Sequence, residues 1–247
     1  MPELTLTTTA GVLSGHLSWV ARSLPTRPTI PVLAGVRLDF TETELRLTVT
    51  DYEVWATATM DCTASGTGSW LLPGRVLADL VARMPDHQML TLTSDGAKVR
   101  LACGTASATL LTLPVQDYPH PPPAGEHVGT VEVTDLAGAL TSVARACSTD
   151  LTLLMLTGIH LTLGPEGITA AATDRYRLSE AELAWQPTLG EDEDALTMLV
   201  PGTALALAAR GLHGTVGLAV ARAADGTPEQ LTLTDQTRTL RLRLLEG

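Results

Sequence analysis

The chain has 247 residues, a formal net charge of -11 and an apolar fraction of 45%, of which little is aromatic. This length can hold two ordinary domains with cores of Leu, Val and Ala. Acidic residues outnumber basic ones 27 to 16, which argues against binding nucleic acid by overall charge alone. No apolar run reaches the roughly 20 residues of a membrane helix, and the first residues lack the layout of a signal peptide, so we expect a cytoplasmic protein without membrane association.

The first half predicts a strand, a helix and three strands, and then the same order again. Alternating apolar and polar residues indicate the strands, and apolar stripes such as Leu13, Leu17 and Val20 indicate the helices. The expected strands are 4–8, 30–40, 44–50, 53–60, 70–72, 89–94, 98–103 and 106–113, and the expected helices are 10–24 and 73–84.

The second half repeats this order after the stiff linker Pro119–Pro123. We expect a strand from Thr130 and an exposed acidic loop at Glu191–Asp194. The other expected elements are strands near 153–163, 167–173, 176–183, 215–221, 229–234 and 239–245, and helices at 135–147 and 202–212. The predicted domains are 1–122 and 128–247.

The two halves also share residues in register. Gly35-Val36-Arg37-Leu38 and Thr50-Asp51 reappear roughly 123 residues later as Gly158-Ile159-His160-Leu161 and Thr173-Asp174. Leu136 and Leu140 fall on Leu13 and Leu17 in the same register. The sequence therefore predicts two copies of one module, in the α+β class.

Arginines mark the predicted helices opposite their apolar stripes. At about 100° per residue, Arg22 lies opposite Leu13, and Arg145 lies opposite Leu136. The only acidic residues on the predicted helices are Asp79 and Asp135. We predict positive helix faces that contact an anionic partner, with an ordinary solvated face as the alternative. The arginines concerned are Arg22, Arg75, Arg83, Arg145 and Arg210.

Several segments resemble the bacterial sliding clamp, the β subunit of replicative DNA polymerase III. They are Arg27–Leu33, Thr50-Asp51, Thr112–Pro114 with Asp117–Pro119, and Ala172–Leu178. The resemblance implies a DNA-clamp fold in which helices on one face line a ring around duplex DNA and sheets cover the other face. It also implies that Arg27 lies near the DNA, whereas Leu153, Leu154 and Met155 stand where the family has Arg and Tyr.

The family has three domains per chain, and the sequence shows no third copy. If six domains close the ring, the resemblance implies a homo-oligomer, namely a homotrimer. Edge strands would join the copies head to tail, and we expect Ala106–Leu113 to meet Thr239–Leu245 of a neighbour.

The resemblance also implies a pocket for a short peptide from the DNA polymerase or the clamp loader. Its half on this chain would comprise Leu156, Thr173, Arg175, Tyr176, Arg177 and Leu178. Arg175 replaces a glycine of the family and Tyr176 a histidine. The alternative is that these residues only close the core and the strand turn.

Catalytic motifs are not evident. Asp51 and Asp174 each follow a Thr at a strand end, where a carboxylate caps backbone amides. The histidines lack metal-ligand spacing, Ser65–Gly68 lacks the lysine of a phosphate-binding loop, and the three cysteines are expected to be buried. We expect no enzyme, metal or cofactor. The predicted function is a sliding-clamp-like processivity factor, and the alternative is a non-ring module that regulates replication by binding clamp partners.

Overall fold

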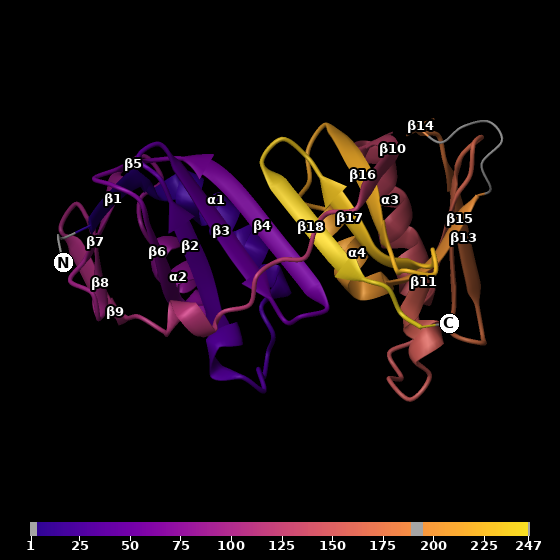
Figure 1. Ribbon diagram of the computed structural model, residues 1–247, viewed down its shortest axis with the longest axis horizontal. Helices are drawn as coiled ribbons and strands as arrows, with labels where there is room; N and C mark the ends of the chain where they lie inside the picture. Colours follow the sequence, from indigo (N-terminus) through magenta and orange to yellow (C-terminus); the bar gives the residue numbers. More distant parts are fainter. Residues whose placement is uncertain (1–3, 189–194, 247) are drawn as a thin grey trace. The chain divides into compact units, whose positions relative to one another are not determined.

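A computed structural model describes residues 4–188 and 195–246 of the chain (Figure 1). The chain divides into two compact units, residues 1–121 and 122–247. The predicted acidic loop Glu191–Asp194 lies outside the described residues.

Unit 1 contains the predicted strand-helix-three-strand order twice. The first set is β1 (Leu4–Thr9), α1 (Ala10–Val20), β2 (Gly35–Phe40), β3 (Glu44–Thr50) and β4 (Val54–Asp61). The second set is β6 (Gly68–Pro73), α2 (Gly74–Val81), β7 (Met89–Ser94), β8 (Lys98–Cys103) and β9 (Ala106–Leu111), and the short β5 (Thr63–Ala64) lies between the sets.

The two sets of unit 1 exchange their first strands. One sheet has the order β5-β1-β7-β8-β9, so β1 of the first set pairs with the strands of the second. The other sheet runs β4-β3-β2-β6, and here β6 of the second set pairs with β2. All these pairings are antiparallel. The exchange ties both halves of the unit into one core.

The helices of unit 1 pack against these sheets and against each other. α1 contacts β3 and β4 of one sheet and β1 of the other, and it lies beside α2. Leu13, Leu17, Leu77 and Val81 carry the predicted apolar stripes and are buried. Aliphatic side chains therefore fill most of the core, as the composition predicts.

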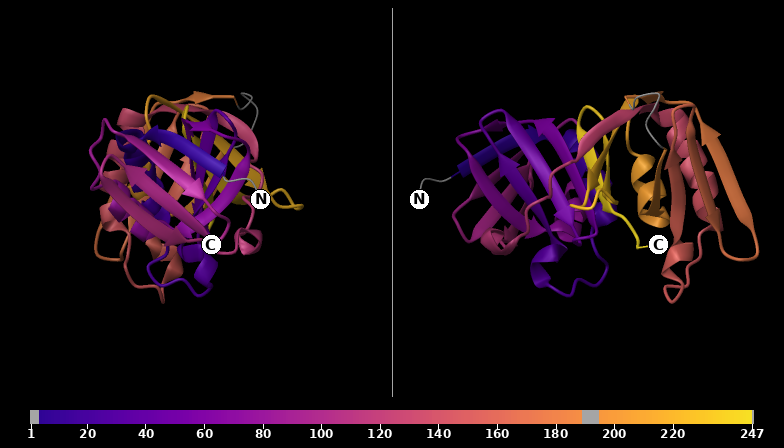
Figure 2. Two further views of the ribbon diagram at one scale, coloured as in Figure 1. Left: turned by 90° about the vertical axis from the view of Figure 1, so that its left-hand side faces the viewer. Right: turned by 45° about the vertical axis from the view of Figure 1, so that its right-hand side comes forward.

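Unit 2 repeats the architecture. Its elements are β10 (Glu126–Glu132), α3 (Val133–Val143), β11 (Gly158–Leu163), β12 (Ile168–Thr173), β13 (Leu178–Leu183), β14 (Gln186–Pro187), β15 (Leu196–Pro201), α4 (Gly202–Ala209), β16 (Thr215–Arg222), β17 (Pro228–Thr234) and β18 (Arg238–Arg243). The strand orders are β14-β10-β16-β17-β18 and β13-β12-β11-β15. Figure 2 shows α3 and α4 side by side, and α3 contacts strands of both sheets.

The sequence pattern overextends some elements and misses others. The predicted strand over 30–40 starts only at Gly35, because Pro31 begins a 3-10 turn, η2 (Pro31–Ala34). Likewise β11 starts only at Gly158, after the 3-10 turn η5 (Leu154–Thr157). The strand β15 and the short β5 and β14 were not predicted.

The segment that follows β9 belongs to the core of unit 1. Tyr118 is buried against Val32, Leu33 and Leu71, and its hydroxyl lies 3.4 Å from the carbonyl oxygens of both Gly35 and Thr48. Leu113 and Val115 pack against the same cluster. The motif residues at 112–119 therefore cover the turn η2.

Candidate functional site

Exposed arginines follow the C-terminal ends of helices α1 to α4. Arg22, Arg83 and Arg145 each lie two residues beyond the last helical residue, and Arg210 lies directly after Ala209. The last carbonyl groups of a helix lack intrahelical partners and carry partial negative charge. A cation at this position stabilises the helix and still presents its guanidinium to solvent.

Most of these arginines lie outside regular α-helix, which corrects the predicted helix backs. The α-helix α1 ends at Val20 instead of Leu24, and Arg22 lies in the 3-10 turn η1 (Ala21–Ser23). Arg145 lies in the 3-10 turn η4 (Ala144–Ala146), and Arg75 is within α2. The spacing of 100° per residue is therefore wrong for Arg22 and Arg145, although their side chains are exposed as predicted.

Hydrogen bonds join two of these arginines to a neighbouring helix or turn of their own unit. Arg75 Nη2 donates to the carbonyl oxygen of Leu24 at 3.0 Å, which places the start of α2 beside the turn that carries Arg22. In unit 2, Arg210 Nε donates to Thr141 Oγ1 at 3.1 Å in the last turn of α3, and α4 contacts the turn that carries Arg145.

Four of these arginines, Arg75, Arg83, Arg145 and Arg210, take part in none of the ion pairs found among the described residues. The same holds for Arg27, which is exposed between η1 and η2. In a chain with a net charge of -11, the helix pairs are thus local sites of positive charge.

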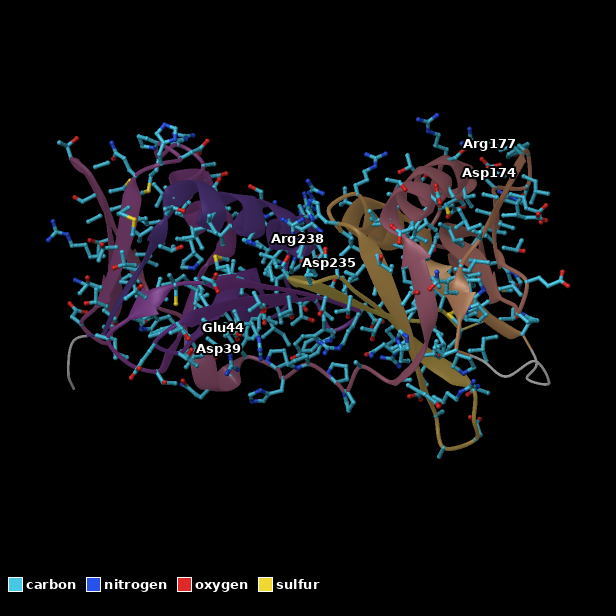
Figure 3. All side chains as sticks on the ribbon, turned by 90° about the horizontal axis from the view of Figure 1, so that it is seen from above. Asp39, Glu44, Asp174, Arg177, Asp235 and Arg238 are labelled. Atoms are coloured by element: carbon cyan, nitrogen blue, oxygen red, sulfur yellow. The ribbon has the colours of Figure 1, made fainter. Side chains whose placement is uncertain are left out.

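The turn between β12 and β13 holds most of the second predicted site. Asp174 Oδ1 accepts hydrogen bonds from the backbone N–H groups of Tyr176 and Arg177, each at 3.1 Å. Desolvation raises the pKa of Asp174, but these hydrogen bonds and the Arg177 side chain lower it more, so that its pKa is below the ordinary value. Asp174 and Arg177 lie together in Figure 3, with Arg177 Nε 2.9 Å from Asp174 Oδ2.

The same turn occurs elsewhere in the repeat. Asp51 accepts from the backbone N–H groups of Glu53 and Val54 at 3.1 and 2.8 Å. Asp235, which the sequence analysis did not single out, accepts from those of Thr237 and Arg238 at 2.8 and 2.7 Å. The carboxylates of all three turns are occupied in capping backbone amides, which is the structural role predicted for Asp51 and Asp174.

Exposed apolar side chains surround the turn at Asp174. Tyr176 is 90% exposed, Leu178 is 69% exposed, and Met155 in the nearby turn η5 is 58% exposed. Leu151 and Leu154 extend this exposed group.

The loop before η5 approaches the same turn. η5 contacts β12, the strand that leads into Asp174. Hydrogen bonds from Thr152 lower the pKa of Asp150, and the Arg175 guanidinium lowers it further. Leu156 is half-buried. We call Leu151, Leu154, Met155, Tyr176 and Leu178 the apolar patch. Leu151, Leu154 and Met155 were not predicted for this site, although a largely apolar run ahead of a strand is a signal that could have identified them.

The cysteines differ in burial. Cys103 and Cys147 are buried as predicted, and burial raises the pKa of the Cys147 thiol. Cys62 is partly exposed, so the prediction of burial is wrong there. It follows Asp61, the exposed last residue of β4, so the cover of the strand has already ended there. The described residues contain no cluster of His, Cys, Asp and Glu that could hold a metal ion, and none of their helices is long and apolar enough to cross a membrane.

Comparison with known proteins relates the whole chain to one family. Residues 4–122 match the N-terminal domain of the DNA polymerase III beta subunit, and residues 130–247 match its central domain. A beta sliding clamp of Streptomyces coelicolor is 37% identical over 238 residues, and a beta sliding clamp homolog of Streptomyces muensis is 35% identical over 236 residues. Each alignment covers 96% of this chain and 62% of the relative, so the chain spans less than two thirds of these proteins.

Solved structures agree on the fold. The DNA polymerase sliding clamp of Bacillus subtilis superposes with a TM-score of 0.88 at 20% identity, covering 99% of this chain and 65% of that one. The DNA polymerase III beta subunit of Pseudomonas aeruginosa gives a TM-score of 0.87 at 24% identity, covering 98% and 65%. The predicted clamp fold is confirmed, and the chain belongs to the DNA polymerase III beta subunit family, whose N-terminal and central domains it contains.

Proposed function

We propose that this chain acts as a sliding clamp, a processivity factor that encircles duplex DNA as an oligomer and holds replication or repair proteins beside it. The observation that carries the proposal is the family membership of both units. Three copies of a two-unit chain would supply the six units that the clamp resemblance implies for a ring. Such a factor would act in the cytoplasm, where a bacterial chromosome lies.

The exposed arginines at the helix pairs are the proposed DNA contacts. They are Arg22, Arg27, Arg75, Arg83, Arg145 and Arg210. A ring retains DNA by topology, so weak contacts with phosphate suffice and need not read the base sequence. This explains how an acidic protein can act on DNA. Catalysis is not required for this role, and the carboxylates of Asp51 and Asp174 cap backbone amides in their own turns.

Retention on DNA tests the ring. Protein assembled on circular duplex DNA should remain bound during gel filtration at moderate salt and should leave after the circle is cut, because only an intact circle prevents sliding off. Equal loss from circular and linear DNA contradicts the proposal and favours the non-ring module as the alternative.

Salt dependence tests the arginines. On short linear duplex, Arg83→Gln and Arg145→Gln should each reduce the slope of log K against log salt by about 1, as expected when one phosphate contact is lost. Arg46→Gln, on the exposed face of β3, is the matched control and should leave the slope unchanged. Unchanged slopes for both helix-end variants would show that other residues contact the DNA.

The apolar patch with Leu156, Thr173, Arg175 and Arg177 is the proposed docking site for a peptide of a polymerase or clamp loader. Its counterpart in unit 1 supports this, since η2 there is covered by a segment of the chain itself. Val32 and Leu33 are buried under Leu113, Val115 and Tyr118. In the described part of unit 2, no such segment covers Met155. A peptide with apolar anchors would bury this surface.

Griselimycin is a suitable probe, because a Pseudomonas aeruginosa clamp of this fold has been solved bound to it. Tyr176→Ala should weaken binding to this chain about tenfold or more through loss of an aromatic anchor. Tyr52→Ala, at the equivalent turn of unit 1, should leave binding unchanged. If the unmodified chain and both variants bind griselimycin with equal affinity, the ligand does not bind at Tyr176.

A further inference from the structure

In unit 1, the segment that follows β9 shows which side chains the 3-10 turn of the module accepts. The backbone N–H of Leu113 donates to the carbonyl oxygen of Leu71 at 2.8 Å, and the chain then covers η2. Leu113 and Val115 pack on the cluster around Tyr118, which is 2% exposed. This segment is therefore an internal example of a peptide held on the turn.

The hydroxyl of Tyr118 reaches past this cluster to the neighbouring strands. It lies 3.4 Å from the carbonyl oxygens of Gly35 in β2 and Thr48 in β3. Burial raises the pKa of Tyr118, so the hydroxyl stays protonated and can donate to these oxygens. The turn thus holds a tyrosine both by its ring and by its hydroxyl.

Strand register identifies the same positions in unit 2. The residues that pair with Arg37 of β2 are matched by those that pair with His160 of β11. The five positions that hold the tyrosine in unit 1 therefore have counterparts. For Val32, Leu33, Gly35, Thr48 and Leu71, these are Met155, Leu156, Gly158, Ala171 and Leu199, respectively.

Four of the counterparts are accessible in unit 2. Met155 is 58% exposed, whereas Val32 is 6% exposed. Leu156, Ala171 and Leu199 are partly exposed, whereas their counterparts in unit 1 are buried. We call Met155, Leu156, Ala171 and Leu199 the uncovered face.

The backbone groups beside the uncovered face match those of unit 1. The N–H of Leu245 donates to the carbonyl oxygen of Leu199 at 2.9 Å, as Leu113 does at the equivalent edge. The carbonyl oxygen of Gly158 lies 3.5 Å from the Cys147 thiol, and its second lone pair can accept another hydrogen bond. The backbone acceptors that hold the tyrosine in unit 1 are thus present in unit 2.

We propose that the uncovered face binds a peptide with the side-chain pattern of residues 113–118. The pattern is an aliphatic residue, a second one two positions later, and a tyrosine three positions after that. The tyrosine ring packs on Met155, Leu156 and Leu199, and its hydroxyl donates to a carbonyl oxygen of Gly158 or Ala171. The inference deepens the proposed function, on which it rests, because it names the peptide that the docking site selects.

A labelled peptide tests the role of the tyrosine. The probe is a fluorescent synthetic copy of residues 111–119, and fluorescence anisotropy measures its affinity for the 247-residue chain. In the peptide, Tyr118→Phe should weaken binding about three- to tenfold, because the carbonyl oxygens lose their donor. Tyr118→Ala in the peptide should weaken binding at least about thirtyfold, because the aromatic anchor is lost as well.

Matched methionine variants of the protein locate the binding site. Met155→Glu puts a charge on the uncovered face and should weaken peptide binding at least about tenfold. Met89→Glu is the control, because Met89 of unit 1 is 55% exposed, and it should leave the affinity unchanged. Both side chains lie largely in water, so both variants should keep the melting temperature of the unmodified chain.

Three results would overturn the inference. The first is no binding of the probe, and the second is equal affinity for the tyrosine and phenylalanine peptides. The third is an affinity that ignores Met155→Glu, which would mean that the probe displaces the native segment of unit 1. A sedimentation coefficient that falls with Met155→Glu, without probe binding by the unmodified chain, assigns the uncovered face to a second copy and also overturns the inference.

The outcomes separate this inference from the proposed function. Griselimycin binding that is lost with Tyr176→Ala, together with no binding of the probe, leaves the proposed docking site standing and rejects the tyrosine peptide alone. Tyrosine-selective binding that depends on Met155 supports the inference even when the protein leaves circular and linear DNA equally, a result that contradicts only the clamp function.

Discussion

Units 1 and 2 differ in the burial of one equivalent turn of their shared module. In unit 1, η2 is buried, with Val32 only 6% exposed beneath Tyr118. In unit 2, the equivalent turn η5 leaves Met155 58% exposed. The backbone plan is common to both, so the difference lies in what covers the turn. One module thus gives a closed core in one unit and a candidate docking site in the other.

The largest effect should come from removing the cover in unit 1. Tyr118→Ala deletes a buried aromatic ring and should destabilise unit 1 by about 3 to 4 kcal/mol. Met155→Ala in unit 2 should change stability by no more than about 0.5 kcal/mol, because that side chain is already in water. Urea unfolding, with hydrogen exchange to assign the loss to a unit, measures both. Similar costs for the two variants would show that the turns are equally packed in solution.

The second largest effect on stability is expected at the turn aspartates, and it should differ between Asp235 and Asp174. Asp235 has a side chain that is 2% exposed, and it accepts backbone hydrogen bonds from Thr237, Arg238 and His213. Asp235→Ala leaves these backbone N–H donors without an acceptor and should lower the free energy of unfolding by about 2 kcal/mol. Asp174→Ala should cost less, because its side chain is 20% exposed and water can reach the freed donors. Thermal unfolding of the two variants gives the order directly, and a reversed order would contradict the burial seen at these turns.

The contribution of Asp174 to stability depends on pH with a definite sign. The pKa of Asp174 is below its ordinary value in the folded protein, so its contribution to stability is present above the unfolded pKa and is lost as the pH falls through the folded pKa. Asp174→Asn should therefore reduce the loss of stability on acidification. Unfolding midpoints of both proteins from neutral to acidic pH check this, and parallel curves would exclude a role for the carboxylate.

The smallest effect concerns backbone conformation at equivalent positions. Tyr52 and Arg175 both have left-handed φ angles, 78° and 80°. Glycine adopts this conformation without the Cβ clash, so Tyr52→Gly and Arg175→Gly should each stabilise their unit by up to about 1 kcal/mol. Replacement by Ala keeps the clash and serves as the control. Equal stability of the Gly and Ala variants would show that the turns carry no strain.

Much of the fold could be predicted from the sequence, because its signals are local and repeated. Alternating apolar residues gave the strands, the stripe through Leu13 and Leu17 gave α1, and the repeated Thr-Asp pairs gave the capped turns. The doubled module and the motifs at 27–33, 112–119 and 172–178 were enough for the family. The DNA contacts remain a prediction, since arginine positions alone do not say what meets them.

The sequence by itself determined the order of most elements, the repeat and the family, because these depend on residue spacing along the chain. Only the tertiary structure decided that Arg22 and Arg145 lie beyond their helices and that Met155 is exposed where Val32 is buried. Burial and edge exposure depend on which distant segments pack together, as Tyr118 packs on η2. The local periodicity of the sequence does not predict such contacts.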